Sequence, residues 1–331
     1  MGGDHAPTVN IDGAVKTVNE QSDIDVTLVG NEELIREGLK QRRFDPKRIH
    51  VVHASQVVEM HESPSAAIRK KKDSSIRVGL GLVKSGEADA FVSAGHSGVI
   101  MATSLLLLGM SKGVDRPAIA TLMPTVKDTF ILLDVGATVD CKPENLLQFA
   151  LMGNIYGKLI LGRKDPAVAL LSIGEEDTKG NELTKEAFKL IKAAHMNFIG
   201  NIEGKDMFTG KADVVVCDGF IGNIALKISE GLAEGVLQML KQEISSISTG
   251  KIGYLLMKPA IKNFKKRTDY DEYGGAPLLG INGTSIISHG RSSAKAIKNA
   301  LIVASDFARK RVYEEIAAAV AACHHEGETA A

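Results

Sequence analysis

Residues 212–223 read ADVVVCDGFIGN, in which a short apolar run ends in a polar, glycine-rich stretch. A run that is apolar throughout, rather than alternating with polar residues, is typical of a parallel strand buried on both faces. The same succession of apolar run and glycine-containing loop occurs at residues 88–98, 129–140 and 167–182. Because stretches with helical spacing separate these runs, the sequence predicts an α/β fold built on a buried sheet.

Strand and helix patterns alternate along nearly the whole chain. Predicted strands cover residues 25–29, 49–52, 88–93, 118–123, 129–134, 167–172, 198–202 and 213–218. Predicted helices cover residues 32–42, 74–85, 97–108, 143–161, 183–194, 223–245 and 293–315. This alternation predicts a three-layer α/β/α sandwich, with an open, mostly parallel sheet between two layers of helices.

The composition limits the possible functions. The 40 Lys and Arg residues balance 40 Asp and Glu residues, which disfavours a nucleic-acid-binding protein, because such proteins usually carry a basic excess. Three widely spaced cysteines favour reduced thiols in a cytoplasmic protein. The longest apolar stretch, residues 99–110, is too short to cross a bilayer.

Glycine-rich loops follow most of the predicted strands. In open α/β sheets, ligands bind at the carboxyl ends of the strands and at helix N-termini. Exposed backbone N–H groups in such loops attract anions. The sequence therefore predicts a broad, backbone-lined anion site, formed by residues 93–98, 134–140, 172–182, 200–204, 217–223 and 288–293.

Short motifs for nucleotide and metal binding are incomplete. Gly79 and Gly81 begin a dinucleotide-binding pattern, but Lys84 stands at the position of its third glycine. His61 and Glu62 lack the second histidine of a helical zinc site. We therefore expect no organic cofactor and no metal.

Nine segments, in order along the chain, resemble one family. They are MGGDHAP (1–7), SAGHSG (93–98), RPAIATLMPT (116–125), LLDVGATVDCKPENLLQFA (132–150), SIGEEDTKGNE (172–182), FIGNIEGKD (198–206), VVVCDGFIGNIALK (214–227), YGGAPLLGI (273–281) and HGRSSAKAI (289–297). Together they resemble the PlsX family of phosphate acyltransferases, from residue 1 to about residue 315.

The resemblance implies a fold similar to phosphotransacetylases and to isocitrate-dehydrogenase-like proteins. It implies transfer of a fatty acyl group from acyl carrier protein to inorganic phosphate, which yields acyl phosphate for phospholipid synthesis. It further implies a homodimer that needs no cofactor and touches the membrane peripherally, where another acyltransferase consumes the acyl phosphate. We accordingly expect a cytoplasmic, peripherally membrane-associated enzyme.

The sequence departs from the family pattern at three places. Family members usually begin with a short strand ahead of MGGD, whereas this sequence starts at Met1. The usual SAGNTG reads SAGHSG, so that His96 and Ser97 replace Asn and Thr. The usual DVGAN reads DVGAT, with Thr138 at the last position. Each replacement keeps a hydrogen-bonding side chain, so we expect altered rather than abolished function.

Attack of phosphate on a thioester needs hydrogen-bond donors that hold a dianion and stabilise an oxyanion. The resemblance, together with their position in the loops, predicts Lys179 and Asn223 as catalytic residues. The predicted phosphate-binding residues are Gly3, Asp4, His5, Ser93, Gly95, His96, Ser97, Gly98, Asp218, Gly219, Gly222 and His289. Structural roles are the alternatives for several of the residues predicted for the site. They are a solvated loop lysine at Lys179, helix capping by Asn223 or Ser97, a turn at Asp218, a satisfied turn at Asp4 and His5, and a structural histidine at His289.

One segment interrupts the α/β pattern. We predict a single domain over residues 1–320, with an inserted amphipathic helical hairpin at about 246–270 and a disordered tail at 321–331. With a turn near Lys258 and Pro259, the hairpin tip exposes apolar residues beside a basic face, which suits an anionic membrane. These residues are Leu255, Leu256, Met257 and Ile261. Packing of this face on the core or on a dimer partner is the alternative.

Two other functions are compatible with the predicted fold. An isocitrate-dehydrogenase-like oxidoreductase would use NAD and a divalent metal, held by clustered aspartates and an arginine clamp. The strand ends offer glycines and amides instead. A non-enzymatic scaffold for lipid-synthesis proteins at the membrane surface would bind partners without consuming a thioester.

Overall fold

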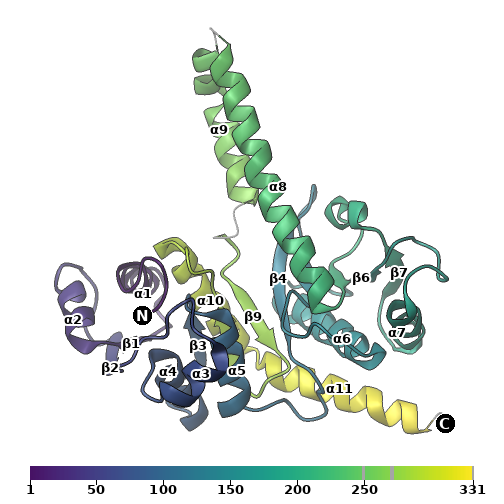
Figure 1. The fold of residues 1–331 in the computed structure, drawn as a ribbon, viewed down its shortest axis with the longest axis horizontal. Helices are drawn as coiled ribbons and strands as arrows, with labels where there is room; N and C mark the ends of the chain where they lie inside the picture. Colours follow the sequence, from purple (N-terminus) through teal and green to yellow (C-terminus); the bar gives the residue numbers. More distant parts are fainter. Residues whose placement is uncertain (248–249, 269–271, 330–331) are drawn as a thin grey trace.

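The computed structural model describes residues 1–247, 250–268 and 272–329. An eight-stranded sheet runs through the body, and a pair of long helices projects from it (Figure 1). The strand order is β3 (Ala90–Ser93), β10 (Thr284–Ile287), β9 (Ala276–Leu279), β4 (Ala118–Pro124), β5 (Thr129–Leu133), β8 (Val214–Val216), β6 (Val168–Leu171) and β7 (Phe198–Ile202). A separate two-stranded parallel sheet consists of β1 (Val26–Gly30) and β2 (Ile49–His53).

Helices cover the sheet, which confirms the predicted α/β architecture (Figure 1). Their bounds are α1 (Thr8–Glu20), α2 (Glu32–Lys40), α3 (Pro64–Lys70), α4 (Ser75–Ser85), α5 (Ser97–Leu107), α6 (Pro143–Leu159), α7 (Glu182–Ala193), α8 (Gly219–Ser246), α9 (Gly250–Thr268), α10 (Ala294–Arg309) and α11 (Val312–Thr329), with a 3₁₀ turn η1 (Gly204–Thr209). Every predicted strand is present, whereas α1, α3, β9 and β10 were not predicted. The predicted helix over 293–315 is two helices, because Arg311 takes a positive φ of 50° between them.

The direction of the strands reverses in the middle of the large sheet. The pairs β10–β9, β9–β4 and β4–β5 are antiparallel, and the other four neighbouring pairs are parallel. The mostly parallel sheet is thus confirmed. Three successive reversals separate β10 from β5, so β3 and β10 run opposite to β5, β8, β6 and β7. The carboxyl ends of β3 and β10 therefore point in the opposite direction to the carboxyl ends of β5, β8, β6 and β7. Below, these two ends of the strands are called the two carboxyl edges of the sheet.

The core explains why the central strands are apolar throughout. From one face of β5 and β8, Ile131 and Val214 pack against Phe149 and Tyr156 of α6. From the other face, residues such as Val215 join a second cluster with side chains of β7 and η1. Burial on both faces is the environment that an uninterrupted apolar run predicts.

A cavity of about 640 Å³ lies between β1 and β3. Consecutive residues of both strands line it, and β1 and β3 do not pair with each other among the described residues. Of the residues predicted to bind substrate, only Ser93 belongs to its described lining. This cavity is therefore not the predicted site.

Helices α8 and α9 form an arm that stands out from the body (Figure 1). With 28 residues, α8 is about 42 Å long. The predicted hairpin is wrong in its position and its turn, because it begins at Gly219 and α9 continues through Pro259. Leu255, Leu256 and Met257 are exposed on α9 as predicted, whereas Ile261 is half-buried.

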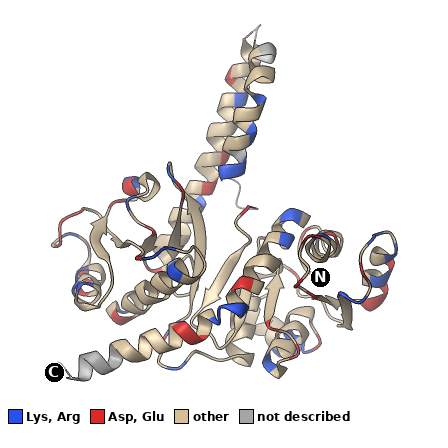
Figure 2. Cartoon of the chain, turned by 180° about the vertical axis from the view of Figure 1, so that it is seen from behind, with Lys and Arg blue, Asp and Glu red and all other residues tan. Residues whose placement is uncertain are grey.

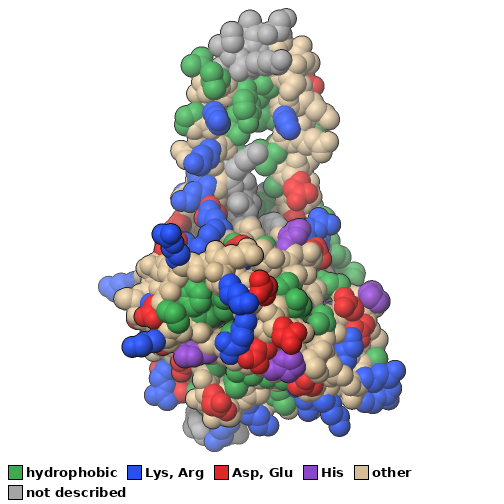
Figure 3. Space-filling view, turned by 90° about the vertical axis from the view of Figure 1, so that its left-hand side faces the viewer, with side chains coloured by type: hydrophobic (Ala, Val, Ile, Leu, Met, Phe, Trp, Pro, Cys, Tyr) green, Lys and Arg blue, Asp and Glu red, His purple; other side chains and the backbone are tan. Residues whose placement is uncertain are grey.

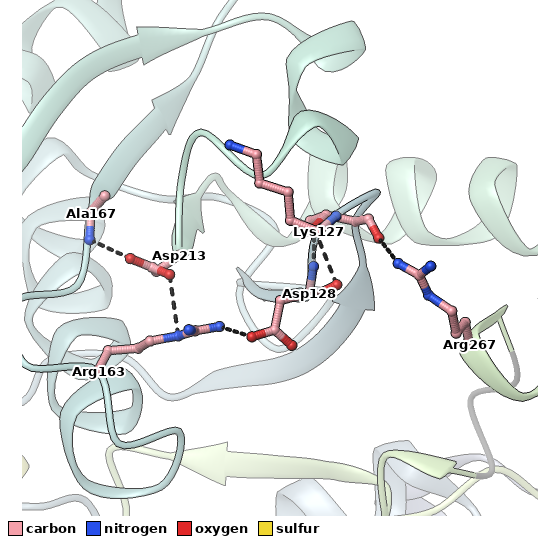
Figure 4. Close-up of polar contacts among 7 residues, drawn as sticks. Lys127, Asp128, Arg163, Ala167, Asp213 and Arg267 are labelled. Carbon is pink, nitrogen blue, oxygen red and sulfur yellow. Dashed lines mark hydrogen bonds and ion pairs between the residues drawn. The ribbon is translucent and has the colours of Figure 1, made fainter.

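The end of α9 is tied to the body at the turn between β4 and β5. Arg267 donates hydrogen bonds of 3.0 Å to the carbonyl oxygens of Thr125 and Val126 in this turn. Asp128 of the same turn pairs with Arg163, which follows α6 (Figure 4). The arm is therefore attached to the body at two places, the start of α8 and the end of α9.

At the carboxyl end of the chain, α11 continues to Thr329. The disordered tail predicted for 321–331 is therefore wrong for residues 321–329, and residues 330 and 331 lie outside the described part. Apolar spacing that includes Ile316 and Val320, both buried in the main core, extends the helix past the predicted boundary. In the described part of the chain, no helix is both long and apolar enough to span a membrane.

Candidate functional site

A buried carboxylate organises the loop that follows β5. The Asp134 side chain accepts hydrogen bonds from the backbone N–H groups of Ile119 at 2.8 Å, Gly136 at 3.1 Å, Ala137 at 3.0 Å and Thr138 at 2.6 Å. Asp134 is fully buried, and burial raises the pKa of its carboxyl, while the N–H groups oppose that rise. The loop at residues 134–138 is thus fixed from inside rather than left open as an anion cradle.

The start of α8 is pressed against this loop. A Cβ atom on Gly222 would stand 1.9 Å from the carbonyl oxygen of Asp134, and one on Gly219 would stand 2.6 Å from its carboxylate. Asp218 caps the helix, because its carboxylate accepts from the N–H groups of Phe220 and Ile221 at 3.0 and 2.9 Å. Helix capping was not among the roles expected for Asp218, which were a turn and the lining of the site; the structure shows it as the N-cap of α8.

Asn223 lies one turn into α8 and is exposed. The capping role left open for it is wrong, because Asp218 occupies the N-cap position. The Asn223 side chain lies beside Gly136, where a Cβ atom would be 3.7 Å from its Cγ. Its exposed amide group is thus in reach of a ligand at the carboxyl ends of β5 and β8.

Lys179 lies in the loop between β6 and α7, at the same edge of the sheet as Asn223, because β6 and β8 are parallel neighbours. Its side chain crosses Gly174, where a Cβ atom would be 2.8 Å from the Lys179 Cγ. The loop is closed by a hydrogen bond of 3.0 Å from Lys179 N to Glu176 O. Among the described residues, no carboxylate forms an ion pair with the Lys179 ammonium, so this cation can meet an anionic ligand.

The other predicted residues gather at the carboxyl edge of β3 and β10. Gly3 packs so closely on Ala94 that a Cβ atom would be 2.8 Å from the Ala94 carbonyl oxygen. Asp4 donates its N–H to Gly290 O at 3.0 Å, and its carboxylate is 3.9 Å from Arg291. His5 is exposed in the same turn.

Within this group, the loop after β3 leads into α5. Gly95 N–H donates to the Ser93 hydroxyl at 3.2 Å. His96 occupies the N-cap position of α5 without a side-chain capping bond, and its buried Nδ1 has no partner in the described structure. Ser97 is the first helical residue, so the capping role left open for it is wrong.

The N-terminus of α5 keeps free donors. The N–H groups of Val99 and Ile100 reach the His96 carbonyl, but those of Ser97 and Gly98 have no hydrogen-bond partner among the described residues. Nearby, His289 follows β10 and accepts the Arg291 N–H on its Nδ1 at 3.1 Å. Free N–H groups at a helix start attract anions.

The predicted site residues thus form two groups rather than one broad site. The first group is Gly3, Asp4, His5, Ser93, Gly95, His96, Ser97, Gly98 and His289; the second is Lys179, Asp218, Gly219, Gly222 and Asn223. They lie at opposite edges of the sheet, and in the described structure no hydrogen bond or ion pair joins them. Of the predicted loop at 200–204, residues 200–202 belong to β7 and Gly204 begins η1, at the same carboxyl end of the sheet as the second group.

Three residues of the second edge were not predicted for the site. Asp134 accepts the hydrogen bonds that hold the loop on which Asn223 rests. Ile173 and Phe220 are exposed apolar residues beside Lys179 and Asn223. Ile173 and Phe220 left a signal in the sequence, since one is a large apolar residue in a polar loop and the other lies at a helix start.

Sequence similarity extends over nearly the whole chain. A family model described as fatty acid synthesis protein matches residues 1–315. The chain belongs to this family. A phosphate acyltransferase of Thermodesulfovibrio yellowstonii is 58% identical over 316 residues, which are 96% of this chain and 91% of the relative. A phosphate acyltransferase of Geobacter sulfurreducens is 52% identical over 317 residues, with the same coverage of 96% and 91%.

The predicted membership of the phosphate acyltransferase family is thereby confirmed, and the chain is an acyltransferase. Two solved phosphotransacetylases share the fold. The Staphylococcus aureus protein has a TM-score of 0.62 at 17% identity, over 91% of each chain. The Streptococcus pyogenes protein has a TM-score of 0.61 at 19% identity, over 92% of this chain and 93% of that one. These likenesses confirm the predicted fold class.

Proposed function

We propose that this acyltransferase moves a fatty acyl group from acyl carrier protein to inorganic phosphate. A phosphate oxygen attacks the thioester carbon, a C–O bond forms, the C–S bond breaks, and the carrier thiolate leaves and takes a proton from water. The thiolate is a good leaving group, so the reaction needs oriented donors rather than a strong acid. The products are acyl phosphate and free carrier protein, and a membrane-bound acyltransferase would consume the acyl phosphate.

The observation that carries this proposal is that Lys179 and Asn223 follow two neighbouring parallel strands, β6 and β8, at the same end of the sheet. The Lys179 ammonium and the Asn223 amide can both donate to the oxyanion that develops on the thioester carbonyl. Both groups are exposed, and the buried Asp134 carboxylate holds the loop against Asn223. A cation and an amide on rigid supports are the parts that acyl transfer to phosphate requires.

The first group supports phosphate binding in the same reaction. The free N–H groups of Ser97 and Gly98 suit a dianion, and the Ser97 hydroxyl adds a further donor. His96 lies at the start of the same helix with a buried, unpartnered ring nitrogen. We propose that this helix start captures phosphate, and that the phosphate then moves to the second group, where it attacks the thioester carbonyl held by Lys179 and Asn223.

Peripheral contact with an anionic membrane is proposed for the arm. Leu255, Leu256 and Met257 are exposed on α9, and the sequence of α9 contains Lys and Arg but neither Asp nor Glu. Hydrophobic side chains gather along the arm (Figure 3), and basic residues mark it (Figure 2). A basic, partly apolar helix favours the interface of an anionic bilayer. The proposed enzyme is a cytoplasmic homodimer. Sedimentation of the purified protein tests whether it is a dimer.

The reaction is tested by incubating the purified protein with hexadecanoyl-acyl carrier protein, with and without phosphate. We expect loss of thioester only with phosphate, acyl phosphate trapped by hydroxylamine as a hydroxamate, and full activity in excess chelator. Phosphate-independent loss of thioester would show a hydrolase. A need for NAD and a divalent ion would favour the oxidoreductase, and partner binding without turnover would favour the scaffold.

A further inference from the structure

The second group of site residues contains more negative than positive charge. Asp134 and Asp218 both carry a carboxyl group beside the start of α8, and Lys179 is the cation of the group. A phosphate dianion that attacks a thioester at this edge is repelled by these carboxylates. The Lys179 ammonium is already assigned to the oxyanion of the thioester carbonyl. The attacking phosphate therefore needs a second cation near the start of α8.

The loop that leads into β4 brings an arginine to the same edge. Strand β4 is antiparallel to β5, so its first residues lie beside the carboxyl end of β5. Arg116 is exposed in this loop, and the following Pro117 favours an extended backbone at Arg116. The loop is fixed by a hydrogen bond of 2.9 Å from Ser111 N to Gly280 O. The Arg116 side chain thus projects from a well-held backbone.

Hydrogen bonds connect this loop to the start of α8. The Thr138 hydroxyl donates to Pro117 O at 2.9 Å. The carbonyl oxygen of the same threonine accepts the Gly219 N–H, also at 2.9 Å. Gly219 is the first residue of α8, and Asn223 lies one turn further along. Thr138 therefore links the residue that follows Arg116 to the helix that carries Asn223.

The positive charge of Arg116 acts at the same place. The Cys141 thiol donates to Thr138 O at 3.4 Å. Burial is the main cause of the raised pKa of this thiol; Asp134 and Asp218 raise it further, whereas Arg116 lowers it. The two carboxylates and the guanidinium group therefore lie close enough to one thiol beside Thr138 to act on it.

Arg116 is available for a ligand. In the part of the chain that the structure describes, no carboxylate forms an ion pair with it. The carboxylate of its neighbour Asp115 accepts instead from Gln148 Nε2 of α6, at 3.4 Å. A guanidinium group offers two parallel N–H donors, which match two oxygens of a phosphate. An exposed arginine without an ion pair, beside the loop at residues 134–138, is thus suited to an anionic substrate.

We propose that Arg116 binds the attacking phosphate at the second group, beside Lys179 and Asn223. This rests on the proposed function, because the second cation is needed only if phosphate attacks a thioester at this edge. The guanidinium group holds two phosphate oxygens and leaves another to attack the thioester carbon. Lys179 and Asn223 contact the carbonyl oxygen, so each of the two substrates has its own cation.

The test separates the two substrates kinetically in the full-length protein. Arg116→Gln and Arg116→Lys are assayed with hexadecanoyl-acyl carrier protein, first with varied phosphate and then with varied thioester. We expect Arg116→Gln to raise KM for phosphate at least about tenfold, with KM for the thioester within about twofold of the parent. Arg116→Lys should recover part of this loss, because it keeps the charge but not the planar fork. Lys112→Gln, an exposed cation of the same loop, is the matched control and leaves both values unchanged.

Each other outcome decides against the proposal in a recognisable way. An unchanged KM for phosphate in a folded Arg116→Gln protein, with an active parent, overturns this inference alone. A raised KM for the thioester only would assign Arg116 to the docking of the carrier protein. Equal losses in Arg116→Gln and Arg116→Lys, with lowered melting temperatures, would assign it a structural role. A parent without phosphate-dependent loss of thioester overturns the proposed function itself, and this inference with it.

Discussion

At its start, α8 is packed against the body, whereas further along the same helix packs on α9 and is largely exposed. Gly219 and Gly222 are the only fully buried residues of its described length, and both lie at the edge formed by β5 and β8. The backbone there approaches Asp134 too closely for any side chain. Further along, Gly231 and Gly235 face open space. The same residue type therefore marks tight internal packing in one region and an unfilled surface in the other.

At the base of α8 the hydrogen bonds and the packing are completed within the protein, whereas the exposed part of the helix is accessible to ligands. At the base of α8, backbone donors and acceptors are paired within the protein, by Asp134 and Asp218. On the described part of the arm, several large apolar side chains stay exposed, among them Leu232, Leu255 and Leu256. The tightly packed carboxyl ends of β5 and β8, called the closed edge below, meet the exposed arm at Asn223. The following predictions test whether the two regions are as different as they look.

The largest expected effect concerns the closed edge. Burial, followed by the negative charge of Asp134, raises the pKa of the Cys141 thiol from 9.0 to about 12. The thiolate is the reactive form, so at pH 8 its population is roughly thousandfold lower than for an ordinary thiol. Cys141 should resist iodoacetamide until the pH approaches 12, as measured by peptide mass spectrometry.

The control for this measurement is an exposed thiol on the arm. Ser245→Cys introduces one at an exposed position of α8 and should be alkylated at pH 8 at the rate of a small-molecule thiol. Rapid alkylation of Cys141 in the folded protein at that pH would show that the edge of β5 and β8 is open to water.

The second prediction compares glycines. Gly222→Ala places a Cβ against the Asp134 carbonyl and should lower the free energy of unfolding by about 3 kcal/mol or more. Gly253→Ala on α9 meets nothing within 4 Å and should raise it by up to about 1 kcal/mol, because alanine favours helix. Chemical denaturation measures both. Similar free energies for the two variants would remove the distinction between edge and arm.

The third prediction concerns catalysis at the closed edge. Lys179→Ala and Asn223→Ala should each lower kcat about a hundredfold, which is the effect of losing one oxyanion donor. Melting temperatures should not change, because both side chains are exposed. Lys189→Ala on α7, also exposed, is the matched control with normal turnover. Normal kcat in a folded Lys179→Ala protein would exclude this lysine from the mechanism.

The smallest expected effect concerns the arm. Leu255→Glu combined with Leu256→Glu should reduce flotation with anionic liposomes several-fold, because charge on this surface opposes insertion between lipid headgroups. Stability should be retained, since both leucines are exposed. Leu34→Glu on α2 makes a similar exposed change away from the arm. Undiminished flotation of the double variant would mean that α9 does not contact lipid.

Local patterns in the sequence determined much of this protein. The uninterrupted apolar runs at β5 and β8 predicted their burial on both faces, and the glycine-rich loops predicted where those strands end. Nine segments were enough to place the chain in its family. The exposure of Leu255, Leu256 and Met257 also followed from their spacing. Each of these properties depends on residues that are close together in the chain.

Other properties were decided by contacts between distant segments. Strands β9 and β10 were missed, because β9 contains Pro277, which is unusual inside a strand, and β10 begins with the polar residues Thr284 and Ser285. The tertiary structure alone inserts β9 between β10 and β4, which reverses the sheet and sends the two groups of site residues to opposite edges. Pro259 likewise predicted a turn where α9 continues. Strand direction depends on which segments pair, and pairing between residues far apart in the chain leaves no local pattern.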